Sequence, residues 1–343
     1  MKTFKNSELK TFEQLASLTQ NSLKKVLSSF LKRHYKKIIE TKDYIFAEGD
    51  IPIALVAHMD TVFEKDITSN GRELYYDEKH NVMFSPHGAG FDDKAGVFAI
   101  LQIIKGGQKP HVIFTTDEEY GALGAMELSK LDCPFTNLKY IIQLDRRGSD
   151  DCVFYDCDNE EFVEYIESFG FTWNYGSFTD ISELCPPWQI AGVNLSVGYR
   201  DEHSATEVLF VGQLLATISK VKKMLNAAAE APVFKYIPMA NTPYGKDWYT
   251  WNKNTYSWSD SNEVMKCHNC KKYFMEEELF PAVMLDKTTK FFCPDCLVDN
   301  VAWCRECGSA FEKYSPEAPN TGICPICEDL EEKTKNDRPK AKV

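Results

Sequence analysis

The sequence predicts an α/β fold: a mixed, largely parallel sheet with helices on both faces, followed by a small cysteine-rich module. Three observations lead to this prediction. Short runs of β-branched and aromatic residues alternate with helical apolar spacing between residues 44 and 228. A hydrophobic content of 43% in 343 residues is typical of a packed globular core. Eight of the twelve cysteines form four CxxC pairs after residue 266.

The chain is expected to begin with an N-terminal helical segment, residues 1–40, and to continue into one domain, residues 41–231. Apolar residues follow helical spacing over 8–39, with Leu23, Leu27 and Leu31 on one side. Predicted strands cover 44–49, 52–58, 111–116, 139–145, 151–156 and 192–198, and the pair 73–77 and 81–85 is typical of a hairpin. Predicted helices cover 94–105, 122–131, 160–170 and 205–228.

The net charge of -12 argues against general affinity for nucleic acid or anionic membranes, because both require an excess of Lys and Arg. No stretch approaches the roughly 20 apolar residues that span a bilayer, and the first ten residues lack the apolar core of a signal peptide. We therefore expect a cytoplasmic protein without membrane association.

The periodic pattern ends after residue 231. Residues 232–262 are rich in Pro, Asn, Ser, Tyr and Trp, which predicts a linker whose aromatic side chains pack on the protein or line a partner surface. The charged tail, residues 331–343, is predicted to be disordered.

Seven acidic and histidine residues occur in five short phrases, and four of these phrases lie where a predicted strand ends. In open α/β sheets, sites collect beyond the carboxyl ends of the strands, so we expect these residues to meet in space. The residues are His58, Asp60, Asp92, Glu118, Glu119, Asp145 and His203. The remaining histidines that lack such neighbours are expected to be surface or core residues: His34, His80, His87 and His111.

This set matches the needs of a site with two zinc ions. Zinc prefers histidine nitrogen and carboxylate oxygen, and two ions about 3.5–4 Å apart need a carboxylate that bridges them. His58 is a predicted ligand, oriented by a hydrogen bond from its other ring nitrogen to Asp60. Asp92 is the predicted bridge, because Gly88 and Gly90 let the backbone bend tightly before the helix that follows.

The adjacent pair Glu118 and Glu119 offers two roles. One carboxylate is expected to bind metal, while the other reaches the water between the ions as general base. Asp145 closes a buried strand with a carboxylate, and His203 completes the ligand set.

The phrases AHMD, GFDDKAG, TTDEE, QLD and DEH resemble, in order, the motifs of the co-catalytic zinc exopeptidases and deacylases, a group that includes bacterial zinc aminopeptidases and peptidase T-like enzymes. The resemblance covers residues 40–228. It implies His58 and Asp145 on one ion, Glu119 and His203 on the other, and Asp92 as the bridge. It further implies Glu118 as the base and a cis peptide bond after Asp92.

One departure from that group is the short distance between its last two ligands. Only 57 residues separate Asp145 from His203, which leaves no room for the lid or dimerisation domain that many relatives insert there. The chain is therefore expected to be closer to the compact aminopeptidases.

The resemblance implies hydrolysis of a peptide bond, most simply as an aminopeptidase, by a water that bridges two zinc ions and gives its proton to Glu118. Deacylation of N-acyl amino acids or similar amides uses the same groups and stays open. Three residues near the ligands are candidates for binding the ends of a short peptide or amide substrate: Asp180, Tyr199 and Arg200.

The cysteine pairs supply eight thiolates, enough for two closed Cys₄ zinc sites in a module that covers residues 263–330. Tandem zinc ribbons are the favoured arrangement, and a cross-braced arrangement uses the same residues. The eight residues are Cys267, Cys270, Cys293, Cys296, Cys304, Cys307, Cys324 and Cys327. The other four cysteines are expected to be free thiols.

The acidic and aromatic neighbours of the cysteine pairs favour a protein partner for the module over nucleic acid. A different class of function is consistent with this module: a zinc-ribbon adaptor that binds protein or nucleic acid and carries a hydrolase-like domain as a scaffold. Counting bound ions separates the two, because the adaptor needs two zinc ions and the enzyme needs four.

Overall fold

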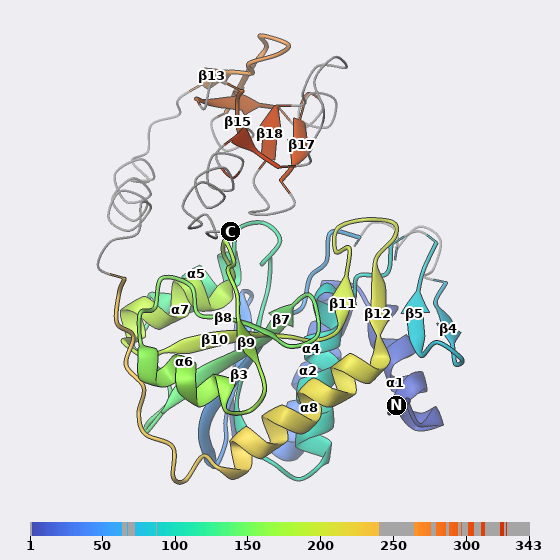
Figure 1. Ribbon diagram of the computed structural model, residues 1–343, viewed down its shortest axis with the longest axis vertical. Coiled ribbons are helices and arrows are strands. Elements are labelled where there is room, and N and C mark those ends of the chain that lie inside the picture. Colours follow the sequence, from blue (N-terminus) through green and yellow to red (C-terminus); the bar gives the residue numbers. More distant parts are fainter. Residues whose placement is uncertain are drawn as a thin grey trace, which may run out of the picture. The chain divides into compact units, whose positions relative to one another are not determined.

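The computed structural model describes residues 2–63, 67, 73–86, 88–239, 264–275, 279–285, 288–293, 296, 301–304, 310–312, 323–325 and 327 (Figure 1). The chain divides into two compact units, Met1–Gly245 and Lys246–Val343. Most of the predicted linker, the predicted disordered tail, His87 and Cys307 lie outside the described residues.

The first unit is built on an eight-stranded sheet with the strand order β1-β2-β6-β3-β7-β10-β8-β9. Its centre is parallel, since β6, β3, β7 and β10 run in one direction, while β2 and β8 join them antiparallel. The strands are β1 (Lys37–Glu40), β2 (Tyr44–Glu48), β3 (Ile51–His58), β6 (Pro110–Thr115), β7 (Tyr140–Arg146), β8 (Asp151–Val153), β9 (Thr172–Trp173) and β10 (Gly192–Ser196). This sheet confirms the predicted fold class.

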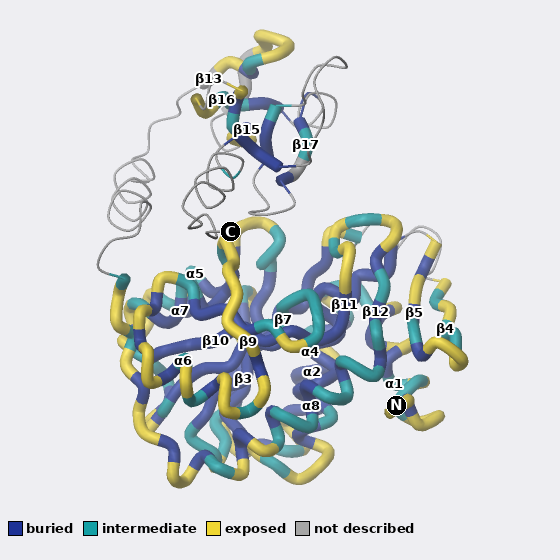
Figure 2. Tube along the Cα trace, viewed as in Figure 1, coloured by how far each residue is buried: buried dark blue, intermediate teal, exposed yellow. Residues whose placement is uncertain are grey.

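Alternating side chains of the central strands enter two separate cores, one on each face of the sheet. Along β3, Leu55 and Ala57 belong to the larger core and Ala54 and Val56 to the smaller one, as the two-residue period of a strand requires. The larger core is covered by α1 (Asn6–Ala16), α2 (Gln20–His34), α4 (Phe91–Lys105), α6 (Glu160–Glu167) and α8 (Val211–Asn226). The smaller core is covered by α5 (Leu123–Ser129) and α7 (Asp180–Trp188). Figure 2 shows the central strands buried between these helices.

A second sheet lies in the same unit, with the order β11-β12-β5-β4. It contains the predicted hairpin as β4 (Tyr75–Asp77) and β5 (Val82–Phe84), extended by β12 (Val208–Phe210) and β11 (Tyr199–Arg200).

Several elements differ from the sequence-based expectation, among them the short strands β9, β11 and β12, which lie outside the predicted strands. The helical spacing over 8–39 resolves into two helices, and Lys37–Glu40 is instead the edge strand β1, paired with β2. The helix expected from residue 205 starts at Val211, because Val208–Phe210 pairs with β5. Helix α7 lies outside the predicted helices, and it contains Pro186 and Pro187 in its last turns, where proline disfavours helix.

The second unit contains a hairpin, β13 (Val264–Lys266) and β14 (Tyr273–Met275), and a four-stranded sheet of order β16-β15-β18-β17. The sheet strands are β15 (Phe280–Val283), β16 (Thr289–Phe292), β17 (Val301–Trp303) and β18 (Ala310–Glu312).

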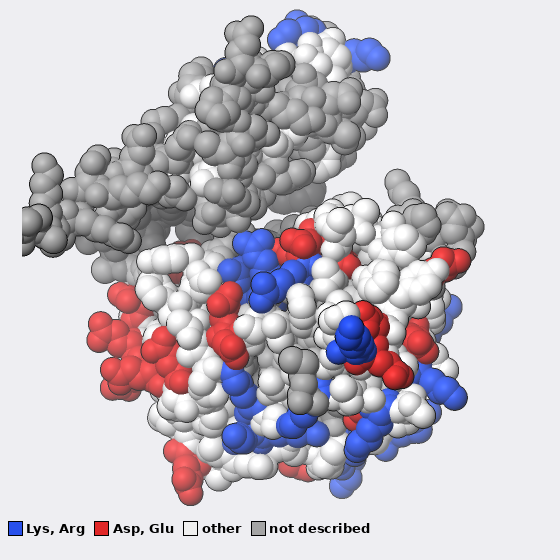
Figure 3. All heavy atoms as spheres, turned by 45° about the vertical axis from the view of Figure 1, so that its right-hand side comes forward, with Lys and Arg blue, Asp and Glu red and all other residues white. Residues whose placement is uncertain are grey.

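The surface of the first unit carries charges of both signs. On the face drawn in Figure 3, Lys and Arg side chains form several small groups interrupted by Asp and Glu, not one continuous basic surface. None of the described helices combines the length and the apolar character that crossing a bilayer requires.

The N-terminal helices are joined to the sheet domain by an aromatic cluster. Phe12 of α1 is fully buried, with its ring centroid 5.8 Å from that of Phe91 and 5.2 Å from that of Phe98, both in α4. Because Phe91 precedes Asp92, this cluster also supports the helix end that carries a candidate ligand.

We expect Phe12→Ala to lower the free energy of unfolding of the first unit by about 3–5 kcal/mol, since it leaves a cavity between α1 and α4. The matched control is Val26→Ala on α2, whose side chain is 45% exposed and should change stability by less than about 0.5 kcal/mol. Urea unfolding measures both. Equal stability of the two variants would mean that the packing of α1 on α4 contributes nothing to the stability of the first unit.

Candidate metal centre

The candidate residues converge at the carboxyl end of the parallel strands. His58 is the last residue of β3, Glu118 and Glu119 follow β6, and Asp145 lies near the end of β7. Strands β6, β3 and β7 are direct neighbours, so their ends meet at one edge of the sheet.

Asp92 stands between two groups of ligand-type side chains. The first group is His58, Asp92 and Asp145; the second is Asp92, Glu119 and His203; in each, the ligand-type atoms lie within 4.8 Å of one another. His58 Nε2 lies 3.0 Å from Asp92 Oδ1, and His203 Nε2 lies 3.3 Å from Asp92 Oδ2. The two carboxylate oxygens of Asp92 thus face different groups, which is the arrangement that a bridging ligand requires.

Asp145 completes the group around His58, and Glu119 completes the group around His203. Asp145 Oδ1 lies 3.5 Å from His58 Nε2, and Glu119 Oε2 lies 2.8 Å from His203 Nε2. The His58 side chain is buried, whereas that of His203 is 51% exposed, so the second group borders solvent. His203 has a φ of +60°, a left-handed conformation that is uncommon outside glycine.

The backbone that carries Asp92 is held by a buried glutamate. Glu207 accepts hydrogen bonds from the N–H groups of Gly90 (2.5 Å), Ala89 (3.2 Å) and Asp92 (2.9 Å), although it lies 115 residues away from Asp92 in sequence. Gly90 has a φ of +62°, consistent with the tight bend expected there, and the peptide bond between Asp92 and Asp93 is cis, as the resemblance implied.

Asp60 orients both His58 and the glutamate pair. Its Oδ1 lies 3.2 Å from His58 Nδ1 and accepts the N–H of Glu118 (3.1 Å), while its Oδ2 accepts the N–H of Glu119 (3.0 Å). A carboxylate on Nδ1 directs Nε2 towards the ligand group. This is the contact that the sequence predicted for Asp60, and the two backbone contacts were not foreseen.

Asp145 is held by three side chains. Tyr199 donates its hydroxyl to Oδ1 (3.0 Å), while Thr179 (2.9 Å) and Gln143 (3.1 Å) donate to Oδ2. These contacts leave Asp145 little freedom to rotate, which favours metal binding over a flexible surface role.

The three predicted substrate-binding residues occupy different settings. Tyr199 is buried against Asp145, and Arg200 is exposed with its guanidinium 5.2 Å from the centre of the Phe210 ring. Asp180 is fully buried and accepts a hydrogen bond from Thr115 (2.6 Å). Binding of substrate by these residues stays a prediction.

The centre crowds carboxylates in a buried space. Burial raises the pKa of Glu118 well above its usual range, and the carboxylates of Asp145, Asp180 and Glu119 raise it further. Burial and Asp92 raise the pKa of Glu119 to about 7. Within the described part of the chain, Glu119 Oε1 and Asp180 Oδ1 are buried without a hydrogen-bond partner. A cation at each group would relieve this repulsion, so the donor set fits two divalent ions.

Sequence reasoning missed the supporting residues Glu207, Gln143 and Thr179. Gln143 stands in the phrase QLD but was given no role there, and the roles of Glu207 and Thr179 depend on contacts between distant segments. His34, His80 and His111 lie outside the two ligand groups, as expected. His111 is buried, and its Nδ1 accepts the N–H of Gly49 at 3.1 Å.

No family model and no curated protein matches the sequence. Among solved structures, the chain is similar to the aminopeptidase PepT from Bacillus cereus (TM-score 0.53, 16% identity), over 65% of this chain and 98% of that one. A tripeptidase from Staphylococcus aureus gives a TM-score of 0.53 at 14% identity, over 65% and 98%. A TET aminopeptidase from a marine sediment archaeon of the Thaumarchaeota gives 0.51 at 11%, over 64% and 96%. At these identities the similarity shows a shared fold.

We expect Glu207→Ala to weaken binding of divalent metal about 10–100-fold, because the backbone that positions Asp92 loses its hydrogen-bond acceptor. The control is Glu230→Ala, an exposed glutamate beyond α8. Zinc affinity of the apoprotein, measured by competition with a chromophoric chelator, compares the two. An unchanged zinc affinity in Glu207→Ala would show that the hydrogen bonds from Glu207 to the backbone around Asp92 do not contribute to metal binding.

Proposed function

We propose that this protein is a zinc-dependent peptidase of the aminopeptidase type, in which two groups of side chains that share Asp92 would each hold a metal ion. The observation that carries the proposal is the position of the Asp92 carboxylate, whose two oxygens face the separate groups around His58 and His203. In this assignment His58 and Asp145 would hold one ion, and Glu119 and His203 would hold the other.

Divalent ions at these groups would supply Lewis acidity, which lowers the pKa of water and makes an amide carbonyl more electrophilic. The chain itself supplies the ligands, their orientation and a proton acceptor. Asp60 and Asp145 are both fixed by hydrogen bonds, so the ligand atoms are held in place before substrate arrives.

Glu118 is the proposed general base. It follows β6 beside the ligand Glu119, and its pKa is raised by burial and by neighbouring carboxylates, which brings proton uptake closer to neutral pH. It takes a proton from the attacking water and returns it to the leaving nitrogen. The peptide C–N bond breaks, and the products are a carboxylate and an amine.

Peptides are the proposed substrates because the structural neighbours are described as aminopeptidases and a tripeptidase. Hydrolysis of N-acyl amino acids would use the same residues, so a substrate panel must contain both classes.

We expect Glu118→Gln to retain bound metal and to lose activity by about 10²–10⁴-fold, since only the proton acceptor is removed. Glu127→Gln, an exposed glutamate in α5, is the control. Wild type and variants are incubated with short peptides and N-acyl amino acids, and the products are followed by mass spectrometry.

Release of single N-terminal residues by wild type and Glu127→Gln alone supports the proposal. Substantial activity in Glu118→Gln with metal bound would remove Glu118 from the role of base. Release of acyl groups without peptide cleavage would move the assignment to a deacylase.

A further inference from the structure

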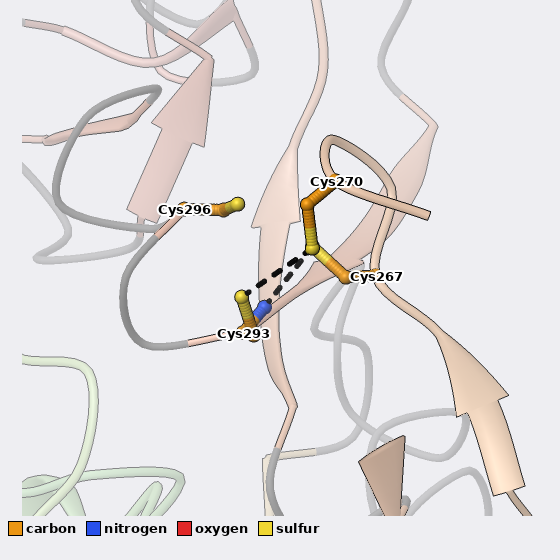
Figure 4. Close-up of side chains that lie close together, drawn as sticks. All are labelled: Cys267, Cys270, Cys293 and Cys296. Carbon is orange, nitrogen blue, oxygen red and sulfur yellow. Dashed lines mark hydrogen bonds between the residues drawn. The ribbon is translucent and has the colours of Figure 1, made fainter. Parts of the chain in front are cut away.

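Four thiols from separate parts of the second unit gather at one point. Cys267 and Cys270 lie in the turn after β13, and Cys293 and Cys296 follow β16 (Figure 4). Their sulfur atoms all lie within 4.8 Å of one another. Cys267, Cys293 and Cys296 are at most 9% exposed, whereas Cys270 is exposed.

The spacing of the sulfur atoms fits a shared metal ion. Cys270 Sγ lies 3.9 Å from Cys293 Sγ. Two thiolates on one tetrahedral zinc, each at about 2.3 Å, lie about 3.8 Å apart. A disulfide would require about 2.05 Å.

N–H groups point at these sulfur atoms. The backbone N–H of Cys293 donates to Cys267 Sγ (3.3 Å), and Asn269 Nδ2 donates to Cys296 Sγ (3.5 Å). Such donors favour the negatively charged thiolate, which is the form that binds metal.

A second group repeats this arrangement. Cys304, Cys324 and Cys327 bring their sulfur atoms within 4.8 Å of one another. The backbone N–H of Cys324 donates to Cys304 Sγ (3.2 Å), just as that of Cys293 donates to Cys267 Sγ. In both groups the first cysteine of the later pair therefore contacts the first cysteine of the earlier pair. The CxxC pairs thus associate in chain order, first with second and third with fourth.

The described apolar core of this unit is small. It consists of two clusters, and the cysteines themselves are among the buried members of both. Strand β16 leads directly into Cys293 and β17 into Cys304, and the two halves of the sheet meet where Val283 pairs with Phe311. Metal ions at the two groups would fix both halves where apolar burial alone is insufficient.

We propose that the second unit holds two separate structural zinc ions, paired in chain order. Cys267, Cys270, Cys293 and Cys296 bind one ion, and Cys304, Cys324 and Cys327 bind the other. Cys307, which the sequence predicts as a further ligand, lies outside the described residues. At the first group four thiolates leave no open position, so this ion stabilises the fold and performs no hydrolysis. The inference is independent of the proposed peptidase activity, because the first centre contains no sulfur ligand.

Cobalt substitution of the full chain tests the pairing. Cobalt is exchanged for zinc, and the sulfur-to-cobalt charge-transfer band reports thiolate ligation only. We expect replacement of Cys267, Cys270, Cys293 and Cys296 by Ser to reduce this band by about half, with the ion of the second group remaining. The control, Cys133→Ser, replaces a partly buried thiol outside both groups and should leave the band unchanged.

Complete loss of the band in a folded quadruple variant would indicate cross-braced pairing and would overturn chain-order association. An unchanged band would show that the first group binds no metal.

A wild-type experiment covers the case in which the quadruple variant does not fold. Native protein is alkylated with and without prior chelation, and the modified cysteines are mapped by mass spectrometry. We expect the seven cysteines of the two groups to be protected until chelator is added, with the reactivity of Cys133 changing less than twofold. Reaction of these seven cysteines before chelation, or iron in place of zinc in the purified protein, would contradict the proposal.

Discussion

The carboxylate of Asp92 lies between two imidazoles, and the arrangement of the first unit around the candidate centre depends on it. One oxygen faces His58 at the end of a central strand, and the other faces His203 in the loop after β11. A displacement of either backbone would separate the two ligand groups. The position of Asp92 is in turn fixed by two contacts. Glu207 accepts hydrogen bonds from three backbone N–H groups at and before Asp92, and the ring of the preceding Phe91 packs against Phe12.

The free-energy cost of burying several carboxylates close together is offset in part by hydrogen bonds from the surrounding residues. Asp60 accepts hydrogen bonds from the backbone of Glu118 and Glu119, and together with His58 these contacts hold its pKa below the usual value despite burial. Burial raises the pKa of Asp145, as it does those of Glu118 and Glu119, although Asp145 also accepts side-chain hydrogen bonds. Bound cations would favour the charged forms of these carboxylates.

The two units differ in the interactions that stabilise them. The first buries a sheet between two layers of helices, and its core contains large aromatic and aliphatic side chains. The second has short strands and two small clusters in which cysteine is a major component. In the first unit the proposed metals would serve chemistry on a scaffold that folds around its own core. In the second the proposed metals would be part of the core itself.

The sequence by itself determined the fold class and the identity of the candidate ligands, because both leave local signals. Strand and helix periods are visible in short windows, and His58, Asp92 and Asp145 stand at strand or helix ends that these windows locate. The tertiary structure decided what depends on contacts between distant segments. Lys37–Glu40 is an edge strand instead of helix, and the last helix begins at Val211 instead of residue 205. In both places the residues pair with a neighbouring strand, although their apolar spacing is that of a helix. The tertiary structure also placed the Tyr199 hydroxyl on Asp145, and it associated the cysteine pairs in chain order where the spacing allowed two arrangements. Glu207 has no local signal at all: its role exists only because the fold brings it beneath a loop that lies more than 100 residues earlier in the chain.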